Sequence, residues 1–342
     1  MVTETTLTGR ARLTCFCILL VALACNVTVL FVPFMEFRQV LTPTTYTFFT
    51  TVEMLWTEKL YALALLVVGF SLLFPFFKLA VLFSVLLPGG PGKIRLRLLN
   101  RVEMLAKWSM LDVFLVCLVL TLTSGQFLVS ASPRAGVSLF IAAIVLSMVV
   151  GQVLAGRLLD HRAHAKHLRL FRITLKPRGR LLLVSASGIL LFGALFVPFL
   201  KIESWFLLDD SFSIASVVPT LWEKKSFTGA LAVGFFLILF PIIRWGVLLK
   251  RNWRIFRGKG ESSHPKLFAL ARFWSMLDVF ALALGVFLIE GSRFVPADAK
   301  LGSALLVVVV LGNVLLERVL EANPKSGEDS ENEVVQSVSV GG

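Results

Sequence analysis

The chain has 342 residues, of which 57% are hydrophobic and only 16% charged, and its mean hydropathy is +0.84. A soluble domain is nearer half apolar and a quarter charged, so this composition excludes a soluble globular protein. The net charge of +13 could indicate a nucleic-acid partner. We expect no nucleic acid, because no aromatic-interleaved basic module accompanies the charge and the basic residues gather between apolar runs.

The apolar runs, taken in chain order, predict eight transmembrane helices. A helix needs about 20 residues to cross a hydrocarbon core of about 30 Å. The first run lacks a small-residue cleavage site in a good position, so we interpret it as a retained helix and not as a signal peptide. The runs are 13–35, 60–88, 108–129, 136–156, 181–200, 226–249, 273–289 and 301–316.

Lys and Arg are concentrated in three of the connecting loops, 88–107, 157–180 and 249–272. Cytoplasmic loops carry such an excess. The sequence therefore predicts a multi-pass protein with both termini in the cytoplasm, and an even number of spans agrees with this.

A tandem duplication organises the chain. The segment Trp108–Phe114 recurs without change as Trp274–Phe280, and an offset one residue shorter maps Leu30–Phe34 onto Leu195–Phe199. We therefore predict an all-α polytopic membrane protein built of two parallel four-helix repeats. The expected segments are a first repeat, a basic cytoplasmic linker, a second repeat and a disordered acidic tail, at 10–157, 158–177, 178–320 and 321–342.

The first external loop of each repeat has strand character. Aromatic and β-branched residues flank a short turn at 34–52 and again at 202–218, a pattern typical of a β-hairpin. We expect each repeat to carry one small periplasmic hairpin.

Four ionisable residues lie inside the predicted spans, at Lys78, Asp112, Arg244 and Asp278. The depths of these four residues in the membrane, counted from the ends of the basic loops, predict two ion pairs. These are Lys78 with Asp112 and Arg244 with Asp278. Inserting an ionisable side chain into a membrane span costs about 2.5–3.5 kcal/mol, so the presence of four such residues indicates a structural or functional role. The pairs could staple the second and third helices, or they could form a proton-responsive or substrate-gating site. A buried lysine can release its proton whereas arginine stays charged, so repeat one is the candidate proton-responsive unit.

Other polar and special residues accompany the charges. Pro75 and Pro241 lie inside the second span of each repeat and predict kinks, static or hinged. The candidate supporting polar residues are Ser109, Ser275, Thr121, Thr123 and Gln126.

No enzyme constellation is present, so we expect neither catalysis nor a cofactor. The sequence has no glycine-rich phosphate loop, no Ser/His/Asp set and no paired carboxylates in one cavity. Its four cysteines lie in apolar runs without zinc-ligand spacing, at Cys15, Cys17, Cys25 and Cys117. We interpret them as small packing residues and expect no metal site.

These motifs resemble the paraquat-inducible protein A family of bacterial inner-membrane proteins. The resemblance is carried by Pro75 with Lys78, Pro241 with Arg244, and the segments Trp108–Phe114 and Trp274–Phe280, and it covers nearly all of 10–320. Typical members also carry a Cys-x-x-Cys zinc ribbon before each unit, and this chain has no such cysteines. Any zinc-dependent role is therefore in doubt.

The resemblance implies a subunit of a lipid transport system in the bacterial inner membrane. Such a subunit would exchange membrane lipid with a periplasmic protein of the mammalian-cell-entry (MCE) type, which forms a tunnel, and the exchange could be coupled to protons. Two alternatives stay open at this point. One is an ion or small-solute transporter, and the other is a non-transporting membrane scaffold or envelope-stress protein.

Overall fold

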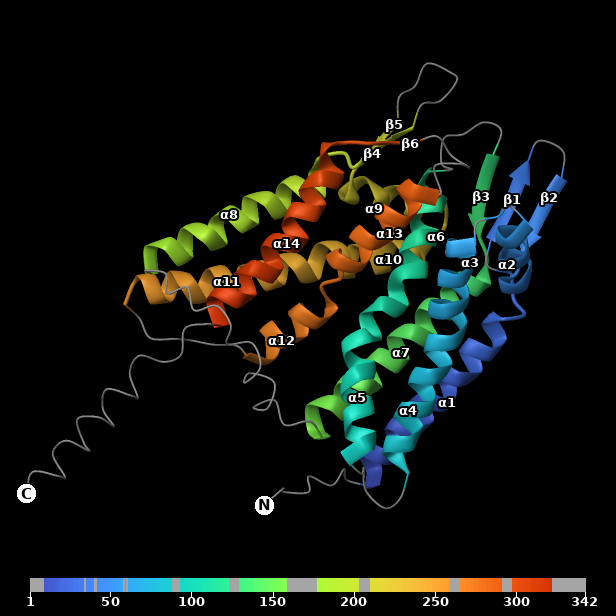
Figure 1. Ribbon diagram of the computed structural model, residues 1–342, viewed down its shortest axis with the longest axis horizontal. Coiled ribbons are helices and arrows are strands. Elements are labelled where there is room, and N and C mark those ends of the chain that lie inside the picture. The colour runs from blue at the N-terminus through green and yellow to red at the C-terminus, as the bar shows by residue number, and fades with distance from the viewer. Residues whose placement is uncertain are drawn as a thin grey trace, which may run out of the picture.

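Helices dominate the computed structural model of the chain (Figure 1). The structure describes residues 9–33, 35–39, 42–57, 59, 61–87, 93–122, 129–158, 177–202, 210–258, 265–290 and 297–321. Within these residues, seven helical segments are long and apolar enough to cross a membrane, and a shorter apolar helix covers Leu301–Leu316. The protein is therefore a polytopic all-α membrane protein, while the count of eight spans stays a prediction.

The first repeat begins with a long helix, a strand pair and a short helix. The elements are α1 (Gly9–Val29), β1 (Met35–Gln39), β2 (Thr42–Tyr46) and α2 (Phe48–Thr57). Its second membrane-crossing segment is built of α3 (Tyr61–Val67), a π-helix η1 (Val68–Leu73) and α4 (Phe74–Leu86). The remaining elements are α5 (Lys93–Leu105), a 3₁₀ turn η2 (Ala106–Met110), α6 (Leu111–Leu122), β3 (Val129–Pro133) and α7 (Ala135–Leu158).

The second repeat follows the same order. It opens with α8 (Pro177–Phe196), β4 (Leu200–Ile202), β5 (Asp210–Phe212) and α9 (Ile214–Glu223). Its second crossing segment is α10 (Phe227–Val233), a π-helix η4 (Gly234–Leu239) and α11 (Phe240–Phe256). It ends with α12 (Pro265–Trp274), α13 (Leu277–Glu290), β6 (Ala297–Ala299) and α14 (Leu301–Glu321).

Each repeat carries a three-stranded antiparallel sheet, in the orders β2-β1-β3 and β5-β4-β6. The third strand comes from the segment before the last helix and was not expected from the sequence. Both sheets lie at the end of the molecule opposite to the start of α5 and to α12 (Figure 1). An ion pair between Arg134 and the buried Glu36 ties the first sheet to the start of α7.

The same close contact closes both repeats. The amide of Gly136 donates to the carbonyl of Pro33 at 3.2 Å, and the amide of Gly302 donates to the carbonyl of Pro198 at 2.9 Å. A Cβ atom at Gly136 would lie 2.7 Å from the Pro33 oxygen, so only glycine permits this approach of a helix start to the preceding turn. Equivalent glycine and proline residues therefore make the same backbone contact in the two repeats.

The two repeats meet along α6 and α13, which lie in the middle of the molecule (Figure 1). Phe114 of α6 and Phe280 of α13 occupy the same position in the duplicated heptapeptide. Their rings contact each other edge to face, with centroids 5.9 Å apart. One continuous core of buried apolar side chains includes residues from both repeats, so the halves pack as one body.

Candidate functional site

The repeated heptapeptide marks a break inside the third membrane-crossing segment of each repeat. In repeat one, the 3₁₀ turn η2 separates α5 from α6, and in repeat two α12 ends at Trp274 while α13 begins at Leu277. The sequence predicted that Trp108 would open this helix after a basic loop at 88–107. The structure places the helix α5 inside this predicted loop, so the helical segment begins before Trp108, while the membrane boundary stays a prediction. The heptapeptide is therefore internal to the segment.

A π-helix faces each break from the second crossing segment. The two π-helices, η1 and η4, occupy equivalent positions in the repeats and stand directly before Phe74-Pro75 and Phe240-Pro241. At the break in repeat two, the amide of Met276 donates to the carbonyl of Phe236 in η4 at 3.2 Å. A broken helix inside a membrane must satisfy its backbone groups within the protein, and the π-helix supplies one such partner. Single π-turns are also frequent at functional sites.

The predicted kinks at Pro75 and Pro241 can now be placed. Both prolines follow the π-helix after one intervening residue, within a run of helical backbone. The irregular backbone therefore lies in the turn before each proline. Whether these turns act as hinges stays a prediction.

Asp112 lies in the first turn of α6, immediately after the break, and is buried. The hydroxyl of Ser71, on η1, donates a hydrogen bond to its Oδ2. Its other oxygen, Oδ1, has no hydrogen-bond partner among the described residues. The amino end of α6 and one hydroxyl are thus the described groups that stabilise a charge at Asp112.

Lys78 is 1% exposed and Glu103 is 8% exposed, and these two residues form the second buried charge site of repeat one. Glu103 is the charged neighbour that interacts electrostatically with Lys78. Neither the ammonium nor the two carboxylate oxygens have a hydrogen-bond partner among the described residues. Glu103 also lies against Gly151 of α7, in the space that a Cβ atom would fill. The structure therefore holds two opposite charges close to each other without direct contact.

The predicted pair of Lys78 with Asp112 is corrected by this arrangement. The second and third segments run antiparallel, with Ser71 opposite Asp112 and Lys78 opposite Glu103. Asp112 is nine residues beyond Glu103, which is about 13 Å along a helix. Depths counted from the basic loops failed because the supposed loop contains α5 and Glu103.

Asp278 begins α13 as Asp112 begins α6, but its described ion pair crosses between the repeats. The ammonium of Lys107, in η2, pairs with Asp278 Oδ2, and both side chains are about 30% exposed. Arg244 is buried on α11. No described contact tests its predicted pairing with Asp278, which stays a prediction.

A second polar contact crosses between the repeats beside this ion pair. The indole of Trp274 donates to Gln152 Oε1 of α7 at 2.9 Å. The same indole stacks on the rings of Phe236 and Phe240, at centroid distances of 5.4 and 6.1 Å. Trp274 therefore joins the break in repeat two to its π-helix and to the last helix of repeat one.

The structure places the other candidate residues in different environments. Ser109 and Ser275 are buried at the two breaks, and the hydroxyl of Ser109 has no hydrogen-bond partner among the described residues. Thr121 is buried on α6 and donates to the carbonyl of Cys117 at 2.7 Å. Thr123 and Gln126 lie outside the described residues.

The sequence did not single out Ser71, Glu103 and Lys107. A helical signal was present, because Leu99, Val102, Ala106 and Met110 are all buried and follow helical spacing through the supposed loop. Within the described part of the chain, no group of three His, Cys, Asp or Glu side chains could hold a metal ion. Ionisable side chains inside membrane segments are costly and commonly mark functional positions.

These features define a membrane protein of two tandem units, each with a broken third segment, a π-helix and an acid in the first turn after the break. The family model for paraquat-inducible protein A matches residues 13–163 and 178–323. The chain belongs to this family. The comparison with curated proteins found no match, and the comparison with solved structures found none either.

Proposed function

We propose that this protein is the inner-membrane subunit of an MCE-type lipid transport system, coupled to protons through Asp112. It passes lipid between the membrane and a periplasmic MCE-domain protein. Its chemistry is transport and not catalysis. The observation that carries the proton coupling is a buried acid at a helix break, opposite a π-helix, with a hydroxyl as its described side-chain partner. Buried ionisable groups in membrane segments mark proton relays or substrate paths.

The proposed topology has both termini in the cytoplasm, α14 as the eighth span and the two sheets on the periplasmic side. The basic residues around α5, α11 and α12 support this orientation. The sheets then face the periplasm, where a tunnel-forming partner would dock.

The first prediction tests Asp112 directly. Asp112→Asn keeps the hydrogen bond from Ser71 but cannot change its charge, so we expect normal membrane abundance and the loss of lipid transport. The measurement is transfer of a labelled lipid from proteoliposomes to the purified partner under a proton gradient.

Asp278→Asn is the matched control, because Asp278 has a cation as its described partner. We expect it to weaken transport less than Asp112→Asn does. Full transport by the Asp112→Asn protein, or equal losses in the two variants, would contradict the assignment of the proton-responsive site to repeat one.

A small-solute transporter is the second candidate function. It is favoured by the series of buried polar groups in repeat one, from Glu103 and Lys78 to Asp112 and Thr121. Uptake of a solute into vesicles without any partner protein would support it over lipid transport.

A further inference from the structure

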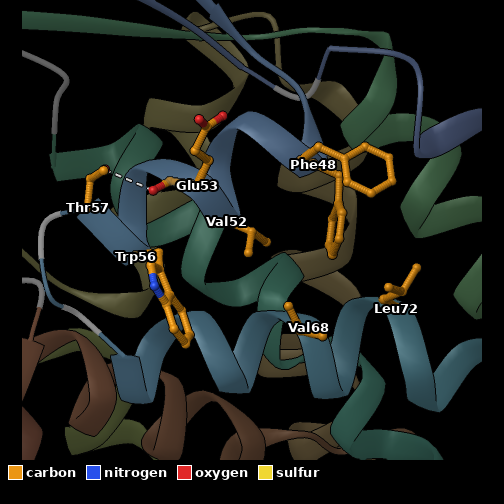
Figure 2. Close-up of a pocket in the computed structure, with 8 residues that line it drawn as sticks. Phe48, Val52, Glu53, Trp56, Thr57, Val68 and Leu72 are labelled. Atoms are coloured by element: carbon orange, nitrogen blue, oxygen red, sulfur yellow. Dashed lines mark hydrogen bonds between the residues drawn. The ribbon is translucent and has the colours of Figure 1, made fainter.

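An apolar groove opens between α2 and η1 in repeat one (Figure 2). It has a volume of about 630 Å³. Val52 and Trp56 of α2 form one wall, Val68 and Leu72 of η1 form the other, and Phe48 and Glu53 also line the groove. Figure 2 shows the indole of Trp56 reaching toward η1, while the carboxylate of Glu53 points away from it. The interior of the groove is therefore apolar.

The groove exists where the two repeats pack differently. In repeat two, α9 packs against η4, α6 and α8, and it buries Ile214, Val217 and Leu221. Its counterpart α2 packs mainly on α3 and β2. The short helix of repeat one therefore stands apart from the centre of the molecule and leaves a space above η1.

The groove is continuous with the lipid-facing surface of a membrane-crossing segment. Val68 and Leu72 belong to the apolar segment Val68–Leu86. Leu65, Leu73 and Phe77 are exposed on the same run of helix, each by more than half. Hydrocarbon surrounds such residues in a bilayer, where unpaired polar groups are excluded. The occupant that this position admits is therefore an apolar chain.

We propose that the groove holds one acyl chain of a phospholipid from the periplasmic leaflet. The proposal rests on the proposed function and names a point at which lipid enters or leaves the protein. Ligand sites commonly enclose about 300–1,000 Å³, and this groove lies in that range. Lipid tails are as apolar as leucine, so packing and not the hydrophobic effect would hold the chain. Weak binding of this kind suits a site of passage.

The π-helix connects the groove to the buried acid. Leu72 lines the groove, and the adjacent Ser71 donates its hydrogen bond to Asp112. One turn of backbone therefore contacts the lipid on one side and holds the proton-responsive acid on the other. Filling and emptying the groove acts on the same turn that fixes Asp112.

The test uses the full-length protein in vesicles that contain phosphatidylcholine with a diazirine in its acyl chain. After irradiation, mass spectrometry maps the labelled peptides. We expect adducts concentrated on residues 48–57 and 68–72, and a several-fold loss of these adducts in Leu72→Trp, which fills the groove. The control is Leu73→Trp, because Leu73 is the next residue of η1 and is 63% exposed. This control should keep full labelling.

Labelling spread evenly over all membrane segments, or unchanged labelling of Leu72→Trp, would refute the proposal that the groove holds an acyl chain. If Leu72→Trp does not accumulate, Val52→Trp fills the groove from the opposite wall and gives the same reading. The outcomes also separate the two proposals. No groove labelling with transport still lost in Asp112→Asn would refute the acyl-chain site alone. Groove labelling with transport intact in Asp112→Asn would refute the proton coupling alone.

Discussion

At the residue scale, the duplicated acids have different surroundings. Asp112 accepts a hydrogen bond from Ser71, and the residue equivalent to Ser71 in repeat two is Leu237. Asp278 pairs with Lys107, and the residue equivalent to Lys107 is Phe273. A charge at Asp278 faces a cation, whereas a charge at Asp112 faces a hydroxyl. The two acids therefore have different polar neighbours, although their local sequences are identical.

The Lys78–Glu103 site gives a second prediction. In Lys78→Met the buried carboxylate loses its positive neighbour, so stability should fall by up to about 3–5 kcal/mol, the cost of breaking a buried pair. Adding Glu103→Gln should restore most of the loss, because no uncompensated charge then remains. Thermal unfolding in detergent measures both proteins.

The matched comparison for this pair is Lys78→Met with Asp112→Asn. This combination should not restore stability, since Lys78 lies opposite Glu103. Recovery with Asp112→Asn and not with Glu103→Gln would show that the antiparallel register described above is wrong.

At the element scale, α5 packs against α7, and Gly151 of α7 leaves space for the Glu103 side chain of α5. A Cβ atom at Gly151 would overlap the carboxylate of Glu103, whereas a Cβ atom at Gly156 on the same helix would meet nothing within 4 Å. The third prediction is that Gly151→Ala costs about 1–3 kcal/mol through overpacking. Gly156→Ala should be neutral or slightly stabilising by helix propensity.

Unfolding midpoints of the two purified glycine variants are the measurement. Equal midpoints would mean that Glu103 moves out of the way without cost, and the α5–α7 contact would then not fix its position. A drop confined to Gly151→Ala would show that α7 holds Glu103 beside Lys78.

The sequence predicted the membrane-protein class, the duplication and the family because each depends on composition or on repeated sequence motifs. It did not predict the helix α5, since the basic residues at 94–107 indicated a connecting loop. Lys and Arg are good helix formers, so their charge alone does not exclude a helix. The π-helices could not be predicted, because Val68–Leu73 and Gly234–Leu239 lie within longer apolar runs of the sequence. Their form depends on the break packed against them.

At the scale of the whole molecule, the two repeats form one body through α6 and α13. Lys107 with Asp278, Trp274 with Gln152, and Phe114 with Phe280 all join one repeat to the other. Side chains in direct contact therefore join the break of repeat one to the break of repeat two.

The ion pair between the repeats supports the fourth prediction. Lys107→Asp alone places two carboxylates together and should lower stability by about 1 kcal/mol, since the pair is partly exposed. The double variant Lys107→Asp with Asp278→Lys should regain membrane abundance. Quantitative immunoblotting of membranes measures the effect. Failure of the double variant to exceed Lys107→Asp alone would argue against the contact.

The fifth prediction concerns topology. In a protein without its four cysteines, a single cysteine at Thr44 should react with an impermeant maleimide from outside the cell. A cysteine at Gly258 should react only after the membrane is opened. Labelling of position 258 from outside would overturn the proposed orientation.

The contact between Lys107 and Asp278 also has a consequence for biosynthesis, because 171 residues separate the two partners in the chain. A ribosome adding about 5–20 residues per second needs roughly 10 to 30 s between them. During that interval repeat one is already inserted, and the ammonium of Lys107 has no carboxylate from repeat two to meet. Its long side chain can extend to water at the membrane surface until Asp278 emerges. Lys107 is thus synthesised before Asp278, and its ammonium can stay hydrated until the carboxylate of Asp278 is in place.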